Sequence, residues 1–345
     1  MTDKKIPFVG LHAHSVAGSI FDAIGYPDEH MDFCYENGGE ALALTDHGNM
    51  NGFSHQFLHW QKMKAQGKEF KPIFGVEAYF LPSIDEWRED YDRIKADAKL
   101  AKTLAKAGDT SGATVEDEEA SKKEVKNILN RRRHLVLLAQ NQTGLNNLFK
   151  LISESYKEEN FYRYPRVDYK LLAKYSEGVI ASSACLGGPY AGNYWANREE
   201  GPEAVREAMR ETSRRFVEVF GDRWYGELQW NNIPEQHELN QYIIETCKEF
   251  DITLISTADS HYPNNEAWKD RELYKRLGWL GKGTPAWAED NTELPEGVEE
   301  IGYELYPKNG NQMWDAYKYY SKVGGHEYDD DLVMNSITET HHIAF

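Results

Sequence analysis

Seven short apolar runs recur along the chain, each bounded by polar residues or by Gly, Pro and Asn. Their length and their content of branched and aromatic residues are typical of buried β-strands. The predicted strands are Pro7 to Leu11, Ala41 to Leu44, Pro72 to Phe80, Leu135 to Ala139, Val179 to Ala181, Tyr225 to Leu228 and Thr253 to Ser256.

Between these runs lie longer segments in which apolar residues recur every three or four positions, the pattern of amphipathic helices. Strands that alternate with such helices predict an α/β fold, specifically a parallel (β/α) barrel with its chemistry at one mouth, where the strand carboxyl ends converge. The clearest predicted helices are Asp28 to Asn37, Leu145 to Tyr156, Pro202 to Phe220 and Pro234 to Phe250.

Two segments interrupt this alternation. From Ile84 to Arg133 the chain is dense in Lys, Glu, Asp and Ala, with a break at Gly108 to Ala113. We expect two solvated helices and a flexible turn there, and a charged hairpin without chemistry is the favoured interpretation. After Tyr262 the sequence is aromatic and loop-rich. Packing under long loops, or against a missing neighbour, is favoured over base stacking for Trp268, Trp279, Trp287, Tyr303, Tyr306, Trp314 and Tyr317.

This division gives three predicted parts: a barrel core over 1–84 and 134–265, a charged helical insertion over 85–133, and a C-terminal extension over 266–345. One detail of the insertion stays open. The triplet of Arg131, Arg132 and Arg133 adjoins His134 and could bind the phosphate backbone of a nucleic-acid substrate.

The charge and cysteine content of the chain limit the classes of function that it can have. Of the 345 residues, 57 are Asp or Glu and 39 are Lys or Arg, a net charge of -18 that disfavours a broad phosphate-binding surface. Contact with nucleic acid must then be local or provided by a partner. The chain begins without an apolar signal core and contains no long apolar run, so we expect no membrane association. Three widely spaced cysteines, Cys34, Cys185 and Cys247, do not suggest a disulfide framework, which fits a reducing cytoplasm.

Side chains suited to metal ions stand beside the predicted strands. His12 and His14 are separated by one residue, so on an extended segment both imidazoles point the same way. Asp259 and His261 repeat this spacing after another strand. Glu77 lies within an apolar strand, where an unpaired carboxylate would cost several kcal/mol to bury and a cation would remove that cost.

Other candidates are weaker when taken alone. His47 follows the run Ala41 to Leu44, directly after Asp46. His134 instead precedes its strand. For Cys185 an inert buried thiol is the alternative interpretation. The convergence of imidazole, carboxylate and thiolate groups on successive strands nevertheless predicts a site for several metal ions and a metal-assisted hydrolysis.

These signatures resemble the PHP (polymerase and histidinol phosphatase) domain, in the form found at the N-terminus of bacterial or phage-encoded DNA polymerase III alpha subunits. The clearest segments are Leu11 to His14, Ala43 to Met50, Lys71 to Tyr79, His134 to Leu151, Phe220 to Glu235 and Ile255 to Tyr262. The resemblance implies a distorted seven-stranded (β/α) barrel with a trinuclear metal centre. Its implied ligands are His12, His14, Asp22, His47, Glu77, His134, Cys185, Asp259 and His261.

The resemblance also implies an activity, a metal-dependent 3′-to-5′ exonuclease that proofreads DNA from its 3′ end. A metal-bound water would be the nucleophile, with no protein nucleophile, and two or three divalent ions would activate it. The mixed ligands favour zinc, with manganese or iron as alternatives.

The sequence departs from the family pattern in three places. Asp22 lies one residue further from His14 than is usual, and Ala184 replaces a usual Gly. The chain ends at Phe345, before the family's palm aspartates and its DNA-binding region. We therefore expect an N-terminal piece of a split or truncated subunit with no polymerase active site of its own. Its partners would then be DNA and the remaining polymerase portion.

Two alternatives remain open. The chain could be a non-catalytic metal-binding module that stabilises and connects a split polymerase. It could also be a small-molecule phosphatase like histidinol phosphatase, although the match at Phe220 to Arg223 and Pro234 to Gln236 favours the polymerase type.

Overall fold

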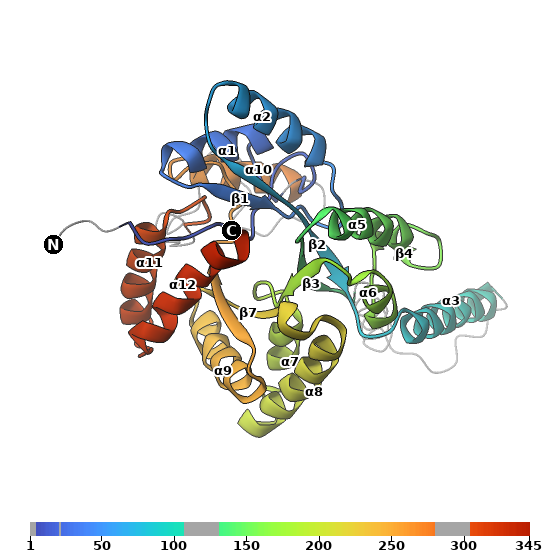
Figure 1. Ribbon diagram of the computed structural model, residues 1–345. Coiled ribbons are helices and arrows are strands. Elements are labelled where there is room, and N and C mark those ends of the chain that lie inside the picture. The colour runs from blue at the N-terminus through green and yellow to red at the C-terminus, as the bar shows by residue number, and fades with distance from the viewer. Residues whose placement is uncertain (1–4, 21, 107–130, 280–303) are drawn as a thin grey trace.

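The computed structural model describes residues 5–20, 22–106, 131–279 and 304–345. At its centre one sheet curls into a half-barrel that helices surround (Figure 1), with the strand order β1-β2-β3-β6-β7-β8. Each strand lies within a residue or two of its predicted run, because buried strands need continuous apolar residues. The strands are β1 (Ala41–Leu44), β2 (Lys71–Phe80), β3 (Arg133–Ala139), β6 (Val179–Ser182), β7 (Trp224–Gln229) and β8 (Thr253–Thr257).

The sheet is mixed, and the prediction of an all-parallel barrel is wrong at β3. The pairs β1–β2, β6–β7 and β7–β8 are parallel, whereas β3 is antiparallel to both β2 and β6. An apolar run has the same composition in either direction, so periodicity carries no information about strand sense. As a consequence, the beginning of β3 lies at the same mouth as the ends of the other strands.

The first predicted strand, Pro7 to Leu11, is not a regular strand. It belongs to an extended segment that makes isolated parallel bridges to both edges of the sheet. Gly10 pairs with Leu42 in β1, and Ala13 pairs with Ser260 just beyond β8. The segment therefore occupies the place of the seventh predicted strand and joins the two edges of the half-barrel.

Helices cover the outside of the sheet (Figure 1). Two of them have the predicted bounds, and both begin with Pro, whose missing N–H costs nothing in the first helical turn. No helix among the described residues is both long enough and apolar enough to cross a bilayer. The surrounding helices are α1 (Pro27–Glu36), α2 (Phe53–Ala65), α5 (Gln142–Ser155), α6 (Tyr169–Tyr175), α7 (Pro189–Asn197), α8 (Pro202–Phe220) and α9 (Pro234–Phe250).

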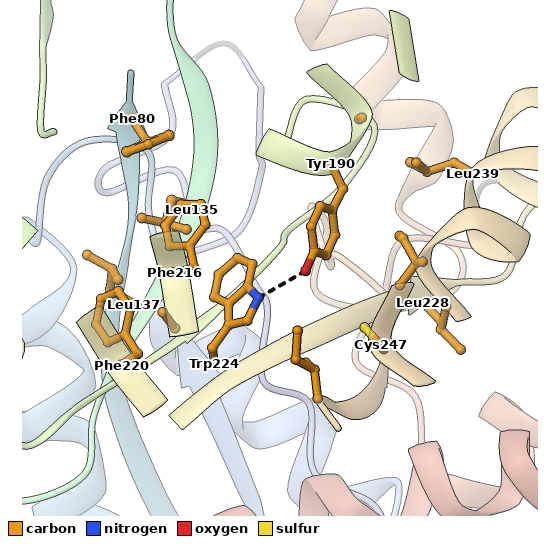
Figure 2. Packing of buried hydrophobic residues seen from close by; sticks show 14 of the residues in the cluster. Phe80, Leu135, Leu137, Tyr190, Phe216, Phe220, Trp224, Leu228, Leu239 and Cys247 are labelled. Carbon is orange, nitrogen blue, oxygen red and sulfur yellow. Dashed lines mark hydrogen bonds between the residues drawn. The ribbon is translucent and has the colours of Figure 1, made fainter. Parts of the chain in front are cut away.

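An aromatic core fixes α7 and α8 to β7 (Figure 2). Phe216 of α8 stacks on Trp224 of β7 with ring centroids 4.1 Å apart and planes within 7°. The indole N–H of Trp224 donates to the Tyr190 hydroxyl of α7 at 3.0 Å, so the buried polar atoms are satisfied. All three side chains are almost fully buried. This packing holds β7 rigidly behind the mouth of the half-barrel.

The charged insertion begins with α3 (Ile84–Lys106), which extends away from the half-barrel (Figure 1). Its first turn is anchored by Ile84 and Trp87, which pack with Leu81 in a small buried cluster. The second predicted helix and the turn at Gly108 to Ala113 lie outside the described residues. A short hairpin of β4 (Phe161–Tyr162) and β5 (Tyr164–Pro165) lies further along the chain.

The C-terminal part is helical where the structure describes it, so the prediction of a loop-rich extension is wrong there. It contains α10 (Trp268–Trp279), α11 (Gly310–Val323) and α12 (Asp330–Ala344). The missed signal was a capping box, in which Asn309 and Gln312 bond each other's backbone N–H groups. Tyr306 and Tyr317 are buried, as the packing interpretation predicts. Trp287 and Tyr303 lie outside the described residues.

Candidate metal centre

The nine side chains predicted as ligands gather at the mouth of the half-barrel. The N-terminal extended segment and the loop after it, the ends of β1, β6 and β8, the body of β2 and the beginning of β3 each contribute. Because β3 is reversed, His134 reaches the mouth from the start of its strand. The contributing residues are His12, His14, Asp22, His47, Glu77, His134, Cys185, Asp259 and His261.

Four of these residues form a fully enclosed group. Donor atoms of His12, His14, Glu77 and Asp259 all lie within 4.8 Å of one another. His12 Nε2 is 2.6 Å from Glu77 Oε2, and His14 Nε2 is 3.1 Å from Asp259 Oδ1. The backbone of Asp259 has a φ of 50°, in the left-handed region that Asp tolerates better than most residues.

Two further groups overlap the first. His14, His47 and His261 form one, and His47, Glu77 and His134 form the other. Glu77 thus belongs to two of the three groups, and a carboxylate with two oxygens is able to bridge two ions. The rings of His14 and His47 are stacked with centroids 4.1 Å apart.

Asp22 and Cys185 lie at the edge of these groups. Asp22 Oδ2 is 3.3 Å from His261 Nε2 and 3.5 Å from His47 Nε2. Cys185 Sγ is 3.9 Å from His134 Nδ1. Ala184, before the cysteine, has a φ of 55°, in the left-handed region that Gly adopts with less strain than Ala.

Unsatisfied atoms in this pocket fit a cation. His14 Nε2, Glu77 Oε1 and Asp259 Oδ1 are buried and have no hydrogen-bond partner of acceptable geometry. Leaving a buried polar atom unsatisfied costs about 1–3 kcal/mol, and more when the group is charged. A divalent ion bound between them would coordinate such atoms directly. The donors present therefore fit a bound metal ion.

Carboxylates in the pocket raise the pKa values of two of its imidazoles, His12 and His14. Burial opposes protonation of His14, but Asp259 and Glu77 outweigh it and raise the pKa of His14 to about 9. Burial likewise opposes protonation of His12, yet Asp259 and Glu227 raise its pKa well above the usual value. Both imidazoles must lose their protons to bind a metal ion through the facing nitrogen.

Glu227 in β7 is a functional side chain that the sequence analysis missed. Its carboxylate is completely buried and accepts hydrogen bonds from His12 Nδ1 at 2.7 Å, Ser182 Oγ at 2.6 Å and Thr257 Oγ1 at 2.6 Å. A carboxylate on the far nitrogen of a ligating imidazole fixes its tautomer and orientation. Like Glu77, Glu227 is a carboxylate within an apolar strand, so the cost of burying it unpaired is the sequence signal that identifies it.

Asp46 supports the same mouth without facing the donors. Its carboxylate accepts from the Ser15 backbone N–H at 2.7 Å, from Ser15 Oγ at 2.9 Å and from Ser19 Oγ at 2.9 Å. Ser19 Oγ in turn lies 3.2 Å from His14 Nδ1 and 3.0 Å from His47 Nδ1. Asp46 therefore holds a serine that orients two of the imidazoles.

Asp22 is held from the C-terminal part of the chain. Arg271 in α10 donates to Asp22 Oδ1 at 2.9 Å and to the Asp22 carbonyl at 2.6 Å. Arg271 is 6% exposed, so this contact is largely shielded from water. Sequence reasoning gave no signal for this pairing, because the two residues lie 249 positions apart.

The three arginines predicted to bind substrate lie in three different environments. Arg131 forms an ion pair with Asp90 of α3 at 3.0 Å. Arg133 lies in β3, and its guanidinium packs against Gly192 of α7. A Cβ atom added to Gly192 would lie only 2.3 Å from Arg133 Nε. Arg132 stacks on Tyr164 beside the mouth, with 3.8 Å between Cζ and the ring centroid.

A curled α/β sheet that brings imidazoles and carboxylates from successive strands to one mouth defines a barrel-type protein with a pocket able to bind metal. The profile of one family, the PHP domain, matches residues 10–231. The chain therefore belongs to the PHP domain family, and the resemblance noted from the sequence is confirmed.

Three curated relatives show the same homology. DNA polymerase III subunit alpha of Aquifex aeolicus is 39% identical over 259 residues, which are 75% of this chain and 18% of that protein. The Campylobacter jejuni subunit is 31% identical over 312 residues, 89% of this chain and 21% of its own length. The Borreliella burgdorferi subunit is 34% identical over 271 residues, 79% and 19% of the two chains. The chain thus spans about a fifth of the length of these relatives.

Among solved structures, an amidohydrolase from Chromobacterium violaceum aligns over 77% of this chain and 96% of its own, with 14% identity and a TM-score of 0.35.

Proposed function

We propose that the chain is a metal-dependent phosphodiesterase that removes nucleotides from the 3′ end of DNA, as a module of a DNA polymerase III alpha subunit. One observation carries this proposal. Donor atoms of His14, Glu77 and Asp259 are buried together in one pocket without hydrogen bonds of acceptable geometry, at the mouth where α/β barrels hold their chemistry. The homology to polymerase subunits supports a DNA substrate.

The donor set would hold two or three divalent ions. His12, His14, Glu77 and Asp259 would hold one, and Glu77 would share a second with two further imidazoles. Imidazoles with a nearby thiol favour zinc, with manganese or iron as alternatives, over an all-oxygen magnesium site. When bound, such ions would supply an activated water nucleophile and neutralise charge on the phosphoryl oxygens.

The side chains around these donors prepare the pocket for that role. Glu227 keeps the Nδ1–H of His12 engaged, so the opposite nitrogen faces the pocket. Ser19, held by Asp46, does the same for the imidazole of His47. None of the described donors needs to act as a protein nucleophile.

Metal ions would also change the electrostatics. The chain carries a net charge of -18, which repels a polyanion at long range. Two or three divalent ions at the mouth would make the local charge there far more positive. The negative chain and its negative substrate are then compatible at this site, and the remaining polymerase portion would provide further binding surface.

The proposal is tested with the full chain. Metal content is measured by elemental analysis, and the chain is then incubated with single-stranded DNA labelled at its 5′ end in the presence of zinc, manganese or iron. We expect stepwise shortening from the 3′ end and loss of that activity in Asp259→Asn. Asp97→Asn, an exposed change on α3, is the matched control and should retain activity.

Two outcomes would contradict the proposal. A chain loaded with metal that cleaves no DNA with any of the three ions would instead support a structural module. Hydrolysis of a phosphomonoester without action on DNA would support a small-molecule phosphatase.

A further inference from the structure

Arg132 and Tyr164 form a cation–π pair beside the metal pocket. The Arg132 guanidinium lies 3.8 Å from the Tyr164 ring centroid and 5.2 Å from that of Tyr79. Both Arg132 and Tyr164 are partly exposed, so a ligand at the mouth can reach them. Stacking uses the face of a guanidinium and does not engage its N–H donors, which lie in the plane.

A buried arginine fixes this pair in place. Arg166 is fully buried and donates to the carbonyls of Tyr162, Tyr164 and Arg131 at 2.8, 2.9 and 3.2 Å. It thereby ties the β4–β5 hairpin, which presents Tyr164, to the chain segment that presents Arg132. The stacked arginine is therefore pre-organised, which lowers the entropy cost of binding a ligand.

Tyr79 places the pair next to the donor cluster. Its ring centroid is 5.7 Å from that of His134 and 5.3 Å from that of Tyr164. Tyr79 and His134 are also direct partners in the β2–β3 register. One ring thus separates Arg132 from the proposed metal ligands, so Arg132 would lie beside a phosphate held at those ligands rather than contact it.

The charge around the pair suits a polyanion. Burial, with smaller contributions from the charges of Arg132 and Arg88, lowers the pKa of Arg166 to about 10. The guanidinium groups of Arg132 and Arg88 therefore both lie near that of Arg166, in a chain whose net charge is strongly negative. This local concentration of positive charge is complementary to a nucleic-acid backbone.

We propose that Arg132, stacked on Tyr164, binds the backbone phosphate next to the scissile one in a single-stranded DNA substrate. The inference rests on the proposed function, because it assigns the second phosphate of that substrate to a particular side chain. It also separates the arginine triplet. Arg131 pairs with α3 and Arg133 packs under α7, so neither would contact the strand.

Binding is measured first, independently of turnover. Fluorescence anisotropy of a labelled single-stranded oligonucleotide, recorded over a series of salt concentrations on the metal-loaded chain, gives the affinity and its salt slope. We expect Arg132→Ala to weaken binding about 10- to 100-fold. The slope of log K against log salt should fall by about 0.7, the value for one phosphate of a single strand. Arg131→Ala, which removes the same charge one residue away, should change affinity less than about twofold.

Arg132→Lys guards against misfolding as the explanation. It keeps the charge but loses the planar stack, so binding should lie between those of the wild type and Arg132→Ala. Circular dichroism melting of each variant shows whether the fold is retained.

Turnover separates this inference from the proposed function. With the oligonucleotide, Arg132→Ala should raise KM. With p-nitrophenyl thymidine 5′-phosphate, which has a single phosphodiester, the same variant should match the wild type. If no variant hydrolyses either substrate, the proposed function fails, while the anisotropy result still decides the role of Arg132.

Three results would overturn the inference. The first is equal affinity and salt slope for Arg132→Ala and Arg131→Ala. The second is no detectable binding of the oligonucleotide by the wild type at low salt. The third is an equal loss of activity on both substrates, because Arg132 would then act at the scissile phosphate itself.

Discussion

Replacement of Glu227 by Gln tests how β7 supports the pocket. Glu227 Oε1 accepts hydrogen bonds from His12 Nδ1, Thr257 Oγ1 and Gln229 Nε2 at 2.7, 2.6 and 3.1 Å. Its Oε2 accepts from Ser182 Oγ at 2.6 Å. A Gln oxygen at the Oε1 position keeps the first three bonds, and the serine hydroxyl can turn to accept from the new amide. The substitution therefore removes the charge while keeping the shape.

The expected loss appears in metal affinity. Removing a carboxylate that orients a ligating imidazole typically weakens metal binding 10- to 100-fold. At about 1.4 kcal/mol per tenfold change, this corresponds to about 1.4–2.8 kcal/mol. A divalent ion carries more charge than the proton that His12 binds in its absence. The lost charge of Glu227 therefore matters more in the metal-bound state than in the metal-free state.

Zinc affinity is measured by competition with a fluorescent chelator of known dissociation constant. Glu218→Gln is the matched control, because Glu218 is exposed on α8. We expect the zinc dissociation constant of Glu227→Gln to rise 10- to 100-fold and that of the control to stay unchanged. Circular dichroism of the metal-free variants should show that both remain folded.

Equal zinc affinity in the two Glu→Gln variants, together with weaker binding in Asp259→Asn, would contradict this role of Glu227. The buried carboxylate would then contribute to packing in β7 but not to holding His12 for a metal ion.

Three further predictions concern stability. Burial lowers the pKa of His30 to about 4, below its usual 6.5. The unfolded chain therefore binds a proton that the native state excludes, and the free energy of unfolding should fall by up to about 3 kcal/mol between pH 6.5 and 4, relative to His30→Gln. Urea titrations across this range measure it, and parallel curves for the two proteins would contradict it. Phe216→Ala should cost about 3–5 kcal/mol in the same titrations, because the ring is fully buried against Trp224; a loss below 1 kcal/mol would contradict the stacking. EDTA should lower the melting temperature of zinc-loaded wild type, because ligand binding stabilises the native state, but not that of Asp259→Asn; equal shifts would place the metal elsewhere.

Much of the fold could be predicted from periodicity because its elements are buried on one or both sides. Pro202–Phe220 and Pro234–Phe250 have the predicted bounds, since an apolar face and a starting Pro define each helix locally. The reversal of β3 could not be predicted, because strand direction depends on the whole sheet. The regular strand predicted at Pro7 to Leu11 became an extended bridge between two edges, and its few backbone pairs leave no trace in composition.

The candidate site was likewise predictable where local sequence carries the signal, and not where tertiary contacts decide. His12, His14 and Asp259 could be proposed from the sequence because they lie beside apolar strands at chelating spacings. The different environments of Arg131, Arg132 and Arg133 depend on contacts with α3, the β4–β5 hairpin and α7. Only the tertiary structure brings these elements together. Asp22 was assigned through the family resemblance alone, and its partner Arg271 comes from a helix beyond the matched residues.

The antiparallel pairing of β2 with β3 has a consequence for how this protein tolerates change. A parallel pair needs a crossover of a dozen residues or more, usually a helix, to return the chain to the opposite edge. An antiparallel pair needs only a turn, so the pairing of β2 with β3 does not itself require the longer insertion between them. Phe80 at the end of β2 and Arg133 at the beginning of β3 are direct partners in the register. The charged insertion lies between these two paired residues. Between the anchored first turn of α3 and Arg131, sequence can therefore be gained, lost or replaced by a reporter domain while the strand pairing of the half-barrel stays intact.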